Sequence, residues 1–165
     1  MEEFKKISND YEIEQFHNIK DQVNIYFSKI SSRNNKYYNI DSITTKEIIN
    51  SQDVFLGFYL WDKMVWIVSY RVKDQNTLYL SRFYIWYIYQ NQWYGKRMMH
   101  HFIKNAQSWW YKYILLETIH KNRLAKAFYS KIWFKKLSNR KINKLPFYHL
   151  YKKIVRKTIM YYIFI

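Results

Sequence analysis

The stretch "FYIWYIYQNQWYGKRMMHHFIK", from Phe83 to Lys104, decides the fold that this sequence predicts. It indicates a strand, then a turn, then a helix that begins near Gly95 with Met98 and Phe102 on its apolar stripe. Free backbone N–H groups at such a helix start, together with the helix dipole, favour a bound anion. The turn has neither the GxxxxGK[ST] pattern of a Walker loop nor GxGxxG. From this stretch alone, phosphate binding and an ordinary strand–helix connection are equally open.

The remaining sequence predicts a mixed α/β fold, a single domain over 1–165, with the order β-α-α-β-β-β-α-β-α-β-β. The expected strands are rich in β-branched and aromatic residues, and the expected helices carry apolar residues at helical spacing. The expected strands are 3–8, 53–62, 63–74, 76–85, 112–119, 134–139 and 147–155, and the expected helices 10–30, 41–52, 94–110 and 122–133. The apolar tail within 154–165 is interpreted as an added strand or packed extension.

Polar residues supply candidate caps at the expected helix starts. The candidates are Asn9 or Asp10 for the first helix, Asp41 or Ser42 for the second and Asn122 for the fourth. The first helix is expected to turn Ile13, Phe16, Ile19, Val23 and Phe27 inward, and the fourth Leu124, Ala127, Phe128 and Ile132. A tight hairpin is expected at Trp61, Asp62 and Lys63.

The composition excludes several classes of protein. The chain has no cysteine, which excludes disulfides and thiolate chemistry. Its start, "MEEFKKISND", is acidic and has no apolar h-region, and no apolar run approaches the roughly 20 residues of a membrane span. These features predict a cytoplasmic protein without a membrane partner.

The net charge of +16 has two interpretations. An anionic partner such as nucleic acid, a membrane surface or a phosphorylated cofactor would explain it. A composition rich in Lys, Asn, Ile, Tyr and Phe, whose codons are AT-rich, explains it as well. The basic segments "NKYYN", "NRKINK" and "YKKIVRK" are scattered, which argues against nucleic acid.

The motif "LSRFYIWYIYQNQWYGKRMM" resembles motif A of the GNAT N-acetyltransferase superfamily, in which a strand leads into Q/R-x-x-G-x-G/A and then a helix. In that register Gln90 takes the Q/R place, Trp93 the first glycine place and Gly95 the second. The later segment "YILLETIHKNRLAKAFYSKIWFKK" is similar to the family's next strand and its N…A…FY…K-x-G-F pattern. Residues 54–136 carry the strong part of the resemblance.

The resemblance implies an N-acetyltransferase that binds acetyl-CoA where two central parallel strands splay apart. The implied cofactor-binding residues are Tyr84, Ile85, Gln90, Asn91, Gln92, Trp93, Tyr94, Gly95, Lys96 and Asn122. An amine would attack the thioester directly. Tyr129 would protonate the leaving thiolate as general acid, and Glu117 is a candidate base. The alternatives left open are a core tyrosine, a structural strand-end carboxylate, and His120 as base.

The acceptor and the assembly are less defined by the sequence. A polyamine acceptor would need acidic residues, and Glu12, Glu14, Asp21 and Asp41 are the candidates. A protein amine is an equal alternative, and a homodimer is open. The adjacent His100 and His101 point in different directions on a helix, so they predict no metal pair. Without cysteines or an HExxH pattern, the sequence predicts no metal site.

Tryptophan occupies several places where the resembled family has glycine. These places are Trp61, Trp66, Trp93, Trp133 and one of Trp109 and Trp110. The chain has 2 Gly and 7 Trp in 165 residues, whereas average usage would give roughly a dozen glycines. Some bacterial lineages read UGA as glycine, and translating such a gene with UGA as tryptophan would produce this pattern. The alternative is a genuine tryptophan-bearing homologue with a blocked loop, acting as a catalytically inactive binding module with a basic surface.

Overall fold

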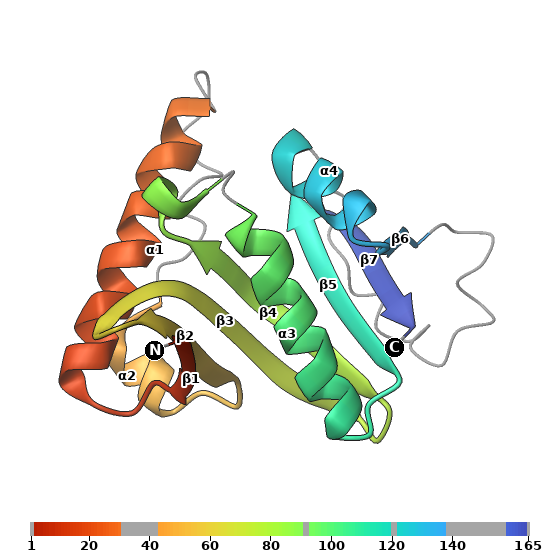
Figure 1. Ribbon diagram of the computed structural model, residues 1–165, viewed down its shortest axis with the longest axis horizontal. Helices are drawn as coiled ribbons and strands as arrows, with labels where there is room; N and C mark the ends of the chain where they lie inside the picture. The colour runs from red at the N-terminus through yellow and green to blue at the C-terminus, as the bar shows by residue number, and fades with distance from the viewer. Residues whose placement is uncertain (1, 31–42, 91–92, 120–121, 138–157, 165) are drawn as a thin grey trace. The chain divides into compact units, whose positions relative to one another are not determined.

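The computed structural model describes residues 2–30, 43–90, 93–119, 122–137 and 158–164 (Figure 1). The chain divides into two compact units, the first within Met1–Arg71 and Ser81–Met98 and the second within Val72–Leu80 and Met99–Ile165. The strand order is β1-β2-β3-β4-β5-β7-β6, a mixed seven-stranded sheet among the described residues. The elements, in chain order, are β1 (Glu2–Lys6), α1 (Asp10–Ile30), α2 (Thr45–Ile49), β2 (Val54–Leu60), β3 (Lys63–Asp74), β4 (Thr77–Ile85), the 3-10 turn η2 (Tyr87–Tyr89), α3 (Tyr94–Ser108), β5 (Tyr113–Ile119), α4 (Arg123–Lys131), β6 (Lys135–Lys136) and β7 (Thr158–Phe164). This confirms the predicted order of helices and strands.

In the first unit, β1, β2 and β3 pair antiparallel in sequence order. The β2–β3 hairpin closes on the pair Leu60↔Lys63, so Trp61 and Asp62 form a two-residue loop. The predicted tight hairpin is confirmed. The register shifts between Phe58 and Tyr59, where a β-bulge interrupts the ladder.

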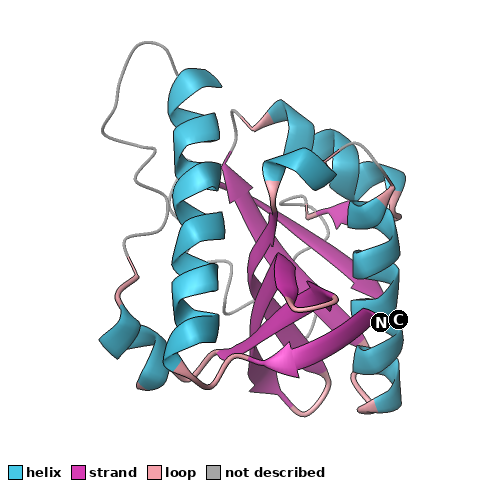
Figure 2. Cartoon of the chain, turned by 60° about the vertical axis from the view of Figure 1, so that its left-hand side comes forward, coloured by secondary structure: helices cyan, strands magenta, loops and turns pink. Residues whose placement is uncertain are grey.

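Helices α1 and α2 cover this sheet with the apolar stripe that the sequence predicts (Figure 2). The stripe residues Ile13, Phe16, Ile19 and Val23 are buried, and they pack in one cluster with Ile48 of α2. The cluster also contains Ile7, Phe55, Tyr59, Met64 and Ile67. The helical period of the sequence therefore identified the core-facing side of α1 correctly, apart from Phe27, whose side chain lies outside the description.

Capping boxes begin both helices. At α1 the Asn9 side chain accepts a bond of 2.9 Å from the Glu12 N–H, and the Glu12 carboxylate accepts one of 3.3 Å from the Asn9 N–H. Asn9 is thus the cap of the two candidates. At α2 the prediction of Asp41 or Ser42 is wrong, because Thr44 is the N-cap, in a reciprocal box with Glu47. Both candidates lie before Ile43, outside the described residues.

In the second unit, β5 has partners on both edges. It pairs in parallel with Thr77–Leu80 of β4 and antiparallel with all of β7, from Tyr113↔Phe164 to Ile119↔Thr158. Its residues Ile114, Leu115 and Leu116 are buried, as a strand covered on both faces requires. The interpretation of the apolar tail as an added strand is confirmed. The strand expected at 147–155 lies outside the described residues.

The predicted inward face of α4 is confirmed only in part. Ile132 is buried as predicted and Phe128 is half-buried, but Leu124 and Ala127 are exposed. Tyr129, which the predicted apolar stripe did not include, is buried instead. The predicted cap is confirmed, since the Asn122 side chain accepts a bond of 3.0 Å from the Ala125 N–H.

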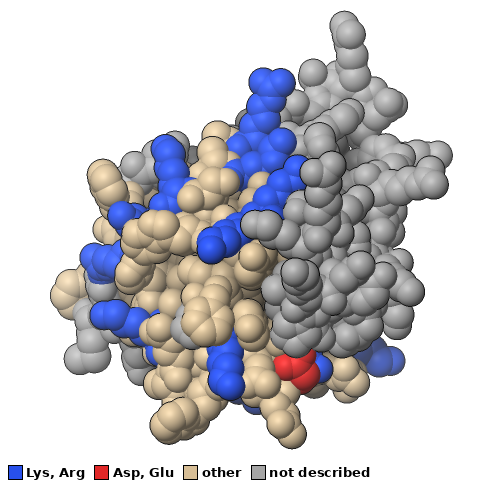
Figure 3. Space-filling model, turned by 90° about the vertical axis from the view of Figure 1, so that its right-hand side faces the viewer, with Lys and Arg blue, Asp and Glu red and all other residues tan. Residues whose placement is uncertain are grey.

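The charged side chains on the face shown in Figure 3 are mostly Lys and Arg. This agrees with the net charge of +16 of the whole chain. Such a surface attracts anionic ligands over long range, with a strength that falls as salt is added. Among the described helices, none is both long and apolar enough to cross a membrane.

Candidate functional site

The central strand β4 extends beyond its pairing with β5. Their parallel register covers four residues, from Thr77↔Tyr113 to Leu80↔Leu116. Strand β4 continues to Ile85 and β5 continues to Ile119. The half-buried Tyr84 and Ile85 lie in this continuation of β4. Backbone groups after Leu80 therefore lie outside the described β4–β5 ladder.

Hydrogen bonds hold the chain where it leaves β4, from Trp86 to Gln90. The Trp86 N–H donates to the Val65 carbonyl at 3.0 Å, and the Tyr89 N–H donates to the Trp86 carbonyl at 2.9 Å. The Gln90 side-chain amide donates to the Ile85 carbonyl at 3.1 Å. Gln90 therefore folds back on the end of β4 and fixes the direction in which the chain leaves the sheet.

The start of α3 has no side-chain cap within the described chain. Its first intrahelical bond runs from the Arg97 N–H to the Trp93 carbonyl, at 3.1 Å. Within the described residues, no acceptor is found for the N–H groups of Tyr94, Gly95 and Lys96. An indole has no oxygen to accept from them. Unpaired donors at the positive end of a helix dipole favour a bound anion in general.

Trp93 itself has φ of 66°, and 79% of its surface is exposed. The Lys96 ammonium lies 5.9 Å from the centre of its indole ring. That ammonium adds a positive charge beside the three N–H donors. Asn91 and Gln92, which the sequence assigns to the same loop, lie outside the described residues.

Tyr129 is buried among aromatic rings of the second unit. Its ring centre lies 5.7 Å from that of Phe134, 5.9 Å from that of Tyr161 and 5.4 Å from that of Phe128. Burial raises the pKa of the Tyr129 phenol well above its ordinary value. The phenol therefore stays protonated at neutral pH. This environment fits a proton donor and a core tyrosine alike.

The other predicted site residues of the second unit are Glu117, Asn122 and His120, and each has a different place in the structure. Glu117 lies half-buried on β5, opposite Met160 of β7. Asn122 uses its side-chain oxygen to cap α4. His120 lies outside the described residues. Asn122 thus has a structural role that the sequence already indicated, in addition to the cofactor role implied by the resemblance.

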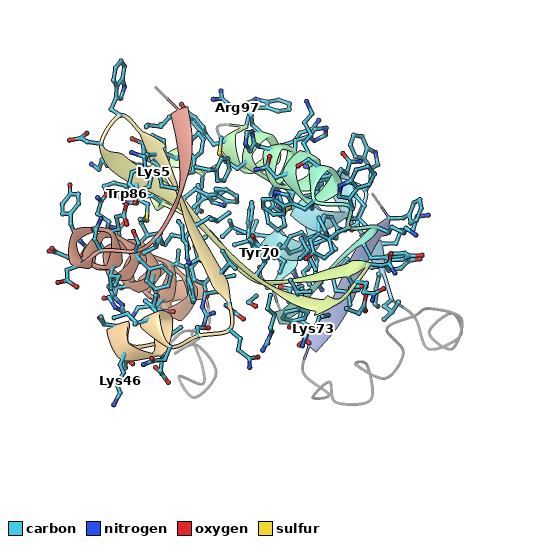
Figure 4. All side chains as sticks on the ribbon, turned by 90° about the horizontal axis from the view of Figure 1, so that it is seen from below. Lys5, Lys46, Tyr70, Lys73, Trp86 and Arg97 are labelled. Carbon is cyan, nitrogen blue, oxygen red and sulfur yellow. The ribbon has the colours of Figure 1, made fainter. Side chains whose placement is uncertain are left out.

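A pocket of about 330 Å³ opens within the first unit. One wall is the face of α1 that carries Tyr11, Glu14 and Gln15, and the opposite wall is the β2–β3 hairpin. Trp86, labelled in Figure 4, also lines it. This volume lies within the range of small-molecule sites.

The lining of this pocket is acidic and aromatic, whereas the chain as a whole is basic. Two carboxylates, Glu14 and Asp62, line it together with one ammonium, that of Lys63. The Lys63 ammonium lies 4.0 Å from the centre of the Trp86 ring, a cation–π contact. The lining therefore carries one net negative charge in a chain of net charge +16. Its chemistry suits a cationic ligand.

Of the three described acidic residues that the sequence singled out, Glu14 alone lines this pocket. Glu12 belongs to the capping box of α1, Asp21 pairs with Lys20 at 3.2 Å, and Asp41 lies outside the described residues. Asp62 and Trp86 were not among the residues that the sequence singled out. Their signal was the tight hairpin, because its turn fixes Asp62 opposite the helix that carries Glu14.

Two polar side chains of the pocket lining hold buried groups without a partner in the described chain. The Gln15 oxygen accepts a bond of 2.7 Å from the Met64 N–H, but its amide nitrogen is buried and unpaired. The Gln22 side-chain oxygen is likewise unpaired. Such groups cost free energy unless water or a ligand satisfies them.

The histidines of α3 lie apart from these features. His100 and His101 are both exposed, and the His100 ring contacts Trp133 with ring centres 5.8 Å apart. Partial desolvation of its ring, and then the charge of the nearby Lys104, lower the pKa of His101. Within the part of the chain that the structure describes, no group of three His, Cys, Asp or Glu residues is placed to hold a metal ion.

Known proteins resemble this chain in structure but not significantly in sequence. No protein-family profile matches the sequence, and no curated protein sequence matches it significantly. The chain is similar in structure to an acetyltransferase from Streptococcus agalactiae, with 18% identity, a TM-score of 0.72 and coverage of 99% of this chain and 98% of that one.

Two further similar structures contain a bound coenzyme. The PaiA N-acetyltransferase of Thermoplasma acidophilum, solved with coenzyme A, has 14% identity, a TM-score of 0.72 and coverage of 100% and 99%. A GNAT-family acetyltransferase of Elizabethkingia anophelis, solved with acetyl-CoA, has 12% identity, a TM-score of 0.64 and coverage of 99% and 98%. The chain therefore has the fold of the GNAT acetyltransferases.

Proposed function

We propose that this chain transfers an acetyl group from acetyl-CoA to an amine. The observation that carries the proposal is the start of α3, where three consecutive N–H groups lack an acceptor among the described residues. Phosphate oxygens are suitable acceptors for such donors. The coenzyme A and acetyl-CoA found in the Thermoplasma and Elizabethkingia proteins support the choice of ligand.

The proposed cofactor contacts are assigned residue by residue. Backbone N–H groups of Tyr94, Gly95 and Lys96 bind the diphosphate, and backbone groups of Tyr84 and Ile85 hold the thioester carbonyl and pantetheine arm. Gln90 positions the loop through its bond to Ile85. The Asn122 amide bonds the pantetheine arm while its oxygen caps α4.

The proposed reaction is direct acyl transfer. The amine nitrogen attacks the thioester carbonyl carbon, a C–N bond forms and the C–S bond breaks. The amine proton goes to Glu117, directly or through water, and the coenzyme A thiolate takes the phenolic proton of Tyr129. The products are an amide and coenzyme A. Donors fixed at the carbonyl stabilise the charge that develops on its oxygen.

The raised pKa limits what Tyr129 contributes. General acids work best when their pKa lies near the operating pH, and a thiol has an ordinary pKa near 8.5. A phenol with a raised pKa keeps its proton until late in C–S cleavage. We therefore expect Tyr129→Phe to lower kcat by about 10²-fold, the low end for general acid catalysis. The KM for acetyl-CoA and the melting temperature stay the same, because the ring is retained.

The pocket of the first unit is the proposed acceptor site. Its carboxylates, Glu14 and Asp62, attract an ammonium, and the Trp86 ring accepts one on its face, as the Lys63 contact illustrates. Small polyamines have this chemistry. Because both carboxylates belong to exposed residues, Glu14→Gln and Asp62→Asn should each raise the acceptor KM by only about two- to fivefold.

Calorimetry with coenzyme A tests cofactor binding. The tryptophan form and the Trp93→Gly form are titrated side by side. The glycine form should bind coenzyme A at least about tenfold more tightly than the tryptophan form. This difference in binding free energy is about that of one charge-assisted hydrogen bond. Glu47→Gln, at the exposed start of α2, is the matched control and should leave the affinity unchanged.

Thiol release from acetyl-CoA then tests turnover against a panel of diamines, polyamines and peptide amines. Turnover of at least one amine by the glycine form supports the proposal. Binding of coenzyme A by neither form would contradict it and favour the inactive binding module. Binding without turnover of any amine would remove the acceptor assignment.

A further inference from the structure

Every non-glycine residue with a left-handed backbone in the described chain is a tryptophan. The φ angles are 64° at Trp61, 66° at Trp93, 68° at Trp110 and 67° at Trp133. Bulky residues rarely adopt this region, and glycine adopts it freely. No glycine of the described chain has a positive φ.

The loop at Trp61 has the geometry of a glycine turn. It is the first of two loop residues between the paired Leu60 and Lys63, and Asp62 has no positive φ. A two-residue hairpin loop with a positive φ only at its first position is a type II′ turn. Glycine is the favoured residue at that position.

The end of α3 is a Schellman motif. The Trp110 N–H donates to the Gln107 carbonyl at 2.9 Å, and the Tyr111 N–H donates to the Ala106 carbonyl at 3.1 Å. These two bonds define Trp110 as the C′ residue of the motif, the position usually occupied by glycine. Its neighbour Trp109 is the C-cap residue of the same motif and has no positive φ.

The end of α4 repeats the same motif. The Trp133 N–H donates to the Ser130 carbonyl at 3.3 Å, and the Phe134 N–H donates to the Tyr129 carbonyl at 3.0 Å. The rings of Phe134 and Tyr129 make the apolar contact that accompanies a Schellman motif, with centres 5.7 Å apart. Trp133 is therefore a second C′ residue in the left-handed conformation.

Trp93 holds the fourth position, the N-cap of α3. Its carbonyl accepts the first helical bond, from Arg97. Ser, Thr, Asp, Asn and Gly are the residues favoured there, and only glycine among them adopts a positive φ without strain. All four positions thus have a local geometric reason for glycine that involves no comparison with other proteins.

The indoles at these positions gain little from burial. Their exposed fractions are 82% for Trp61, 79% for Trp93, 87% for Trp110 and 62% for Trp133. Trp66 is the opposite case, since it lies inside β3 with 1% of its surface exposed and no positive φ. The family resemblance placed Trp66 with the glycine positions, but its backbone does not require glycine.

We infer that glycine occupies positions 61, 93, 110 and 133 in the protein that its source cell makes. A UGA codon read as glycine in that cell and as tryptophan in translation would produce all four at once, since a glycine codon, GGA, differs from UGA by one base. The backbone at Trp66, Trp86 and Trp109 makes no such demand.

Codons and peptide masses test this without any activity assay. The gene should carry UGA at all four positions, and UGG at any of them overturns the inference for that position. Peptides of the protein purified from its source should have masses that match glycine. Tryptophan in those peptides would overturn it even if the codons are UGA.

Thermal unfolding of recombinant variants gives a second test. Trp110→Gly should raise the melting temperature by about 2–4 °C, whereas Trp109→Gly, at the adjacent residue, should not raise it. A chain with all four glycines should melt higher than any single variant. A failure of the tryptophan chain to fold where the four-glycine chain folds also supports the inference. Equal responses at 109 and 110 would contradict it.

Discussion

Trp61 and Trp66 lie five positions apart in one hairpin, yet their environments differ. Trp66 is buried in the core, whereas Trp61 is exposed in a turn with a positive φ. Trp66 is enclosed by aromatic rings, with centres 5.1 Å from Phe4, 5.1 Å from Phe83 and 6.5 Å from Phe58. Trp61 is 82% exposed and sits in a left-handed turn. The side chain therefore explains the position of Trp66, and the backbone alone explains that of Trp61.

The two tryptophans contribute to the free energy of unfolding with opposite sign. A left-handed conformation costs an L-residue roughly 1–2 kcal/mol, so four such tryptophans would cost about 4–8 kcal/mol. The whole net stability of a domain is about 5–15 kcal/mol. Exposed indoles recover little of this by burial. The tryptophan at 66 stabilises the chain, while the one at 61 is a strain on it.

The largest expected effect is at the buried member of the pair. Trp66→Ala should lower the free energy of unfolding by about 3–5 kcal/mol, because it leaves a cavity among the surrounding rings. Urea denaturation measures this change. Ile49→Ala, at a residue 66% exposed, is the control and should change it by less than about 0.5 kcal/mol. A small loss at Trp66 would place it with the strained tryptophans.

The exposed member should respond in the opposite direction. Trp61→Gly should raise the free energy of unfolding by about 1 kcal/mol, because the left-handed turn no longer opposes a Cβ atom. Trp61→Ala separates conformation from size, since alanine removes the indole but keeps the Cβ. If alanine stabilises the chain as much as glycine does, bulk rather than backbone conformation explains Trp61.

Asn122 extends the comparison to a residue with both a structural and a proposed functional role. Asn122→Ala should lower the free energy of unfolding by about 1 kcal/mol through loss of the α4 cap. Asn122→Asp keeps a capping oxygen and should keep most of that stability, but it removes the amide. An unchanged KM for acetyl-CoA in the Asp variant would leave the residue with the structural role only.

The smallest expected effect concerns Glu47 in the capping box of α2. The Thr44 N–H and then the Thr44 hydroxyl lower the pKa of this carboxyl below its ordinary value of 4.5. A lowered folded pKa means that the unfolded chain binds the proton more readily. The stabilisation is therefore present above the ordinary pKa and is lost as pH falls through the folded pKa. Glu47→Gln, which keeps an acceptor but cannot titrate, should remove that part of the pH dependence.

The order of elements could be predicted because each one has a strong local pattern. The stripe of Ile13, Phe16, Ile19 and Val23 sets the face of α1, and alternation with tight turns sets the β2–β3 hairpin. The face of α4 was predicted correctly at Ile132 but not at Leu124 and Ala127, because nine residues carry too few apolar positions to distinguish adjacent registers. The Thr44 cap was missed because Asp41 and Ser42 are equally good capping residues.

The candidate site divides in the same way. The strand–turn–helix pattern predicted where α3 begins but left an anion site and an ordinary connection equally open there, whereas the Asn122 cap followed from its place before α4. The pocket could not be predicted, because Glu14 and Asp62 meet only through the packing of α1 against the hairpin. Sequence distance carries no information on that contact. The tryptophans at glycine places were predicted in part. The sequence could not choose between Trp109 and Trp110 and included Trp66, whereas the φ angles select Trp110 and exclude Trp66.

The pairing of β5 with β7 determines when the second unit can be completed during synthesis. Strand β5 ends at Ile119, but its antiparallel neighbour spans Thr158–Phe164. Synthesis adds about 5–20 residues per second. The edge of β5 that pairs with β7 therefore stays unpaired for seconds after β5 has been made. An open apolar edge is a template for association with other chains. During that interval the open edge of β5 can pair with other chains, so aggregation during synthesis should increase with the concentration of nascent chains.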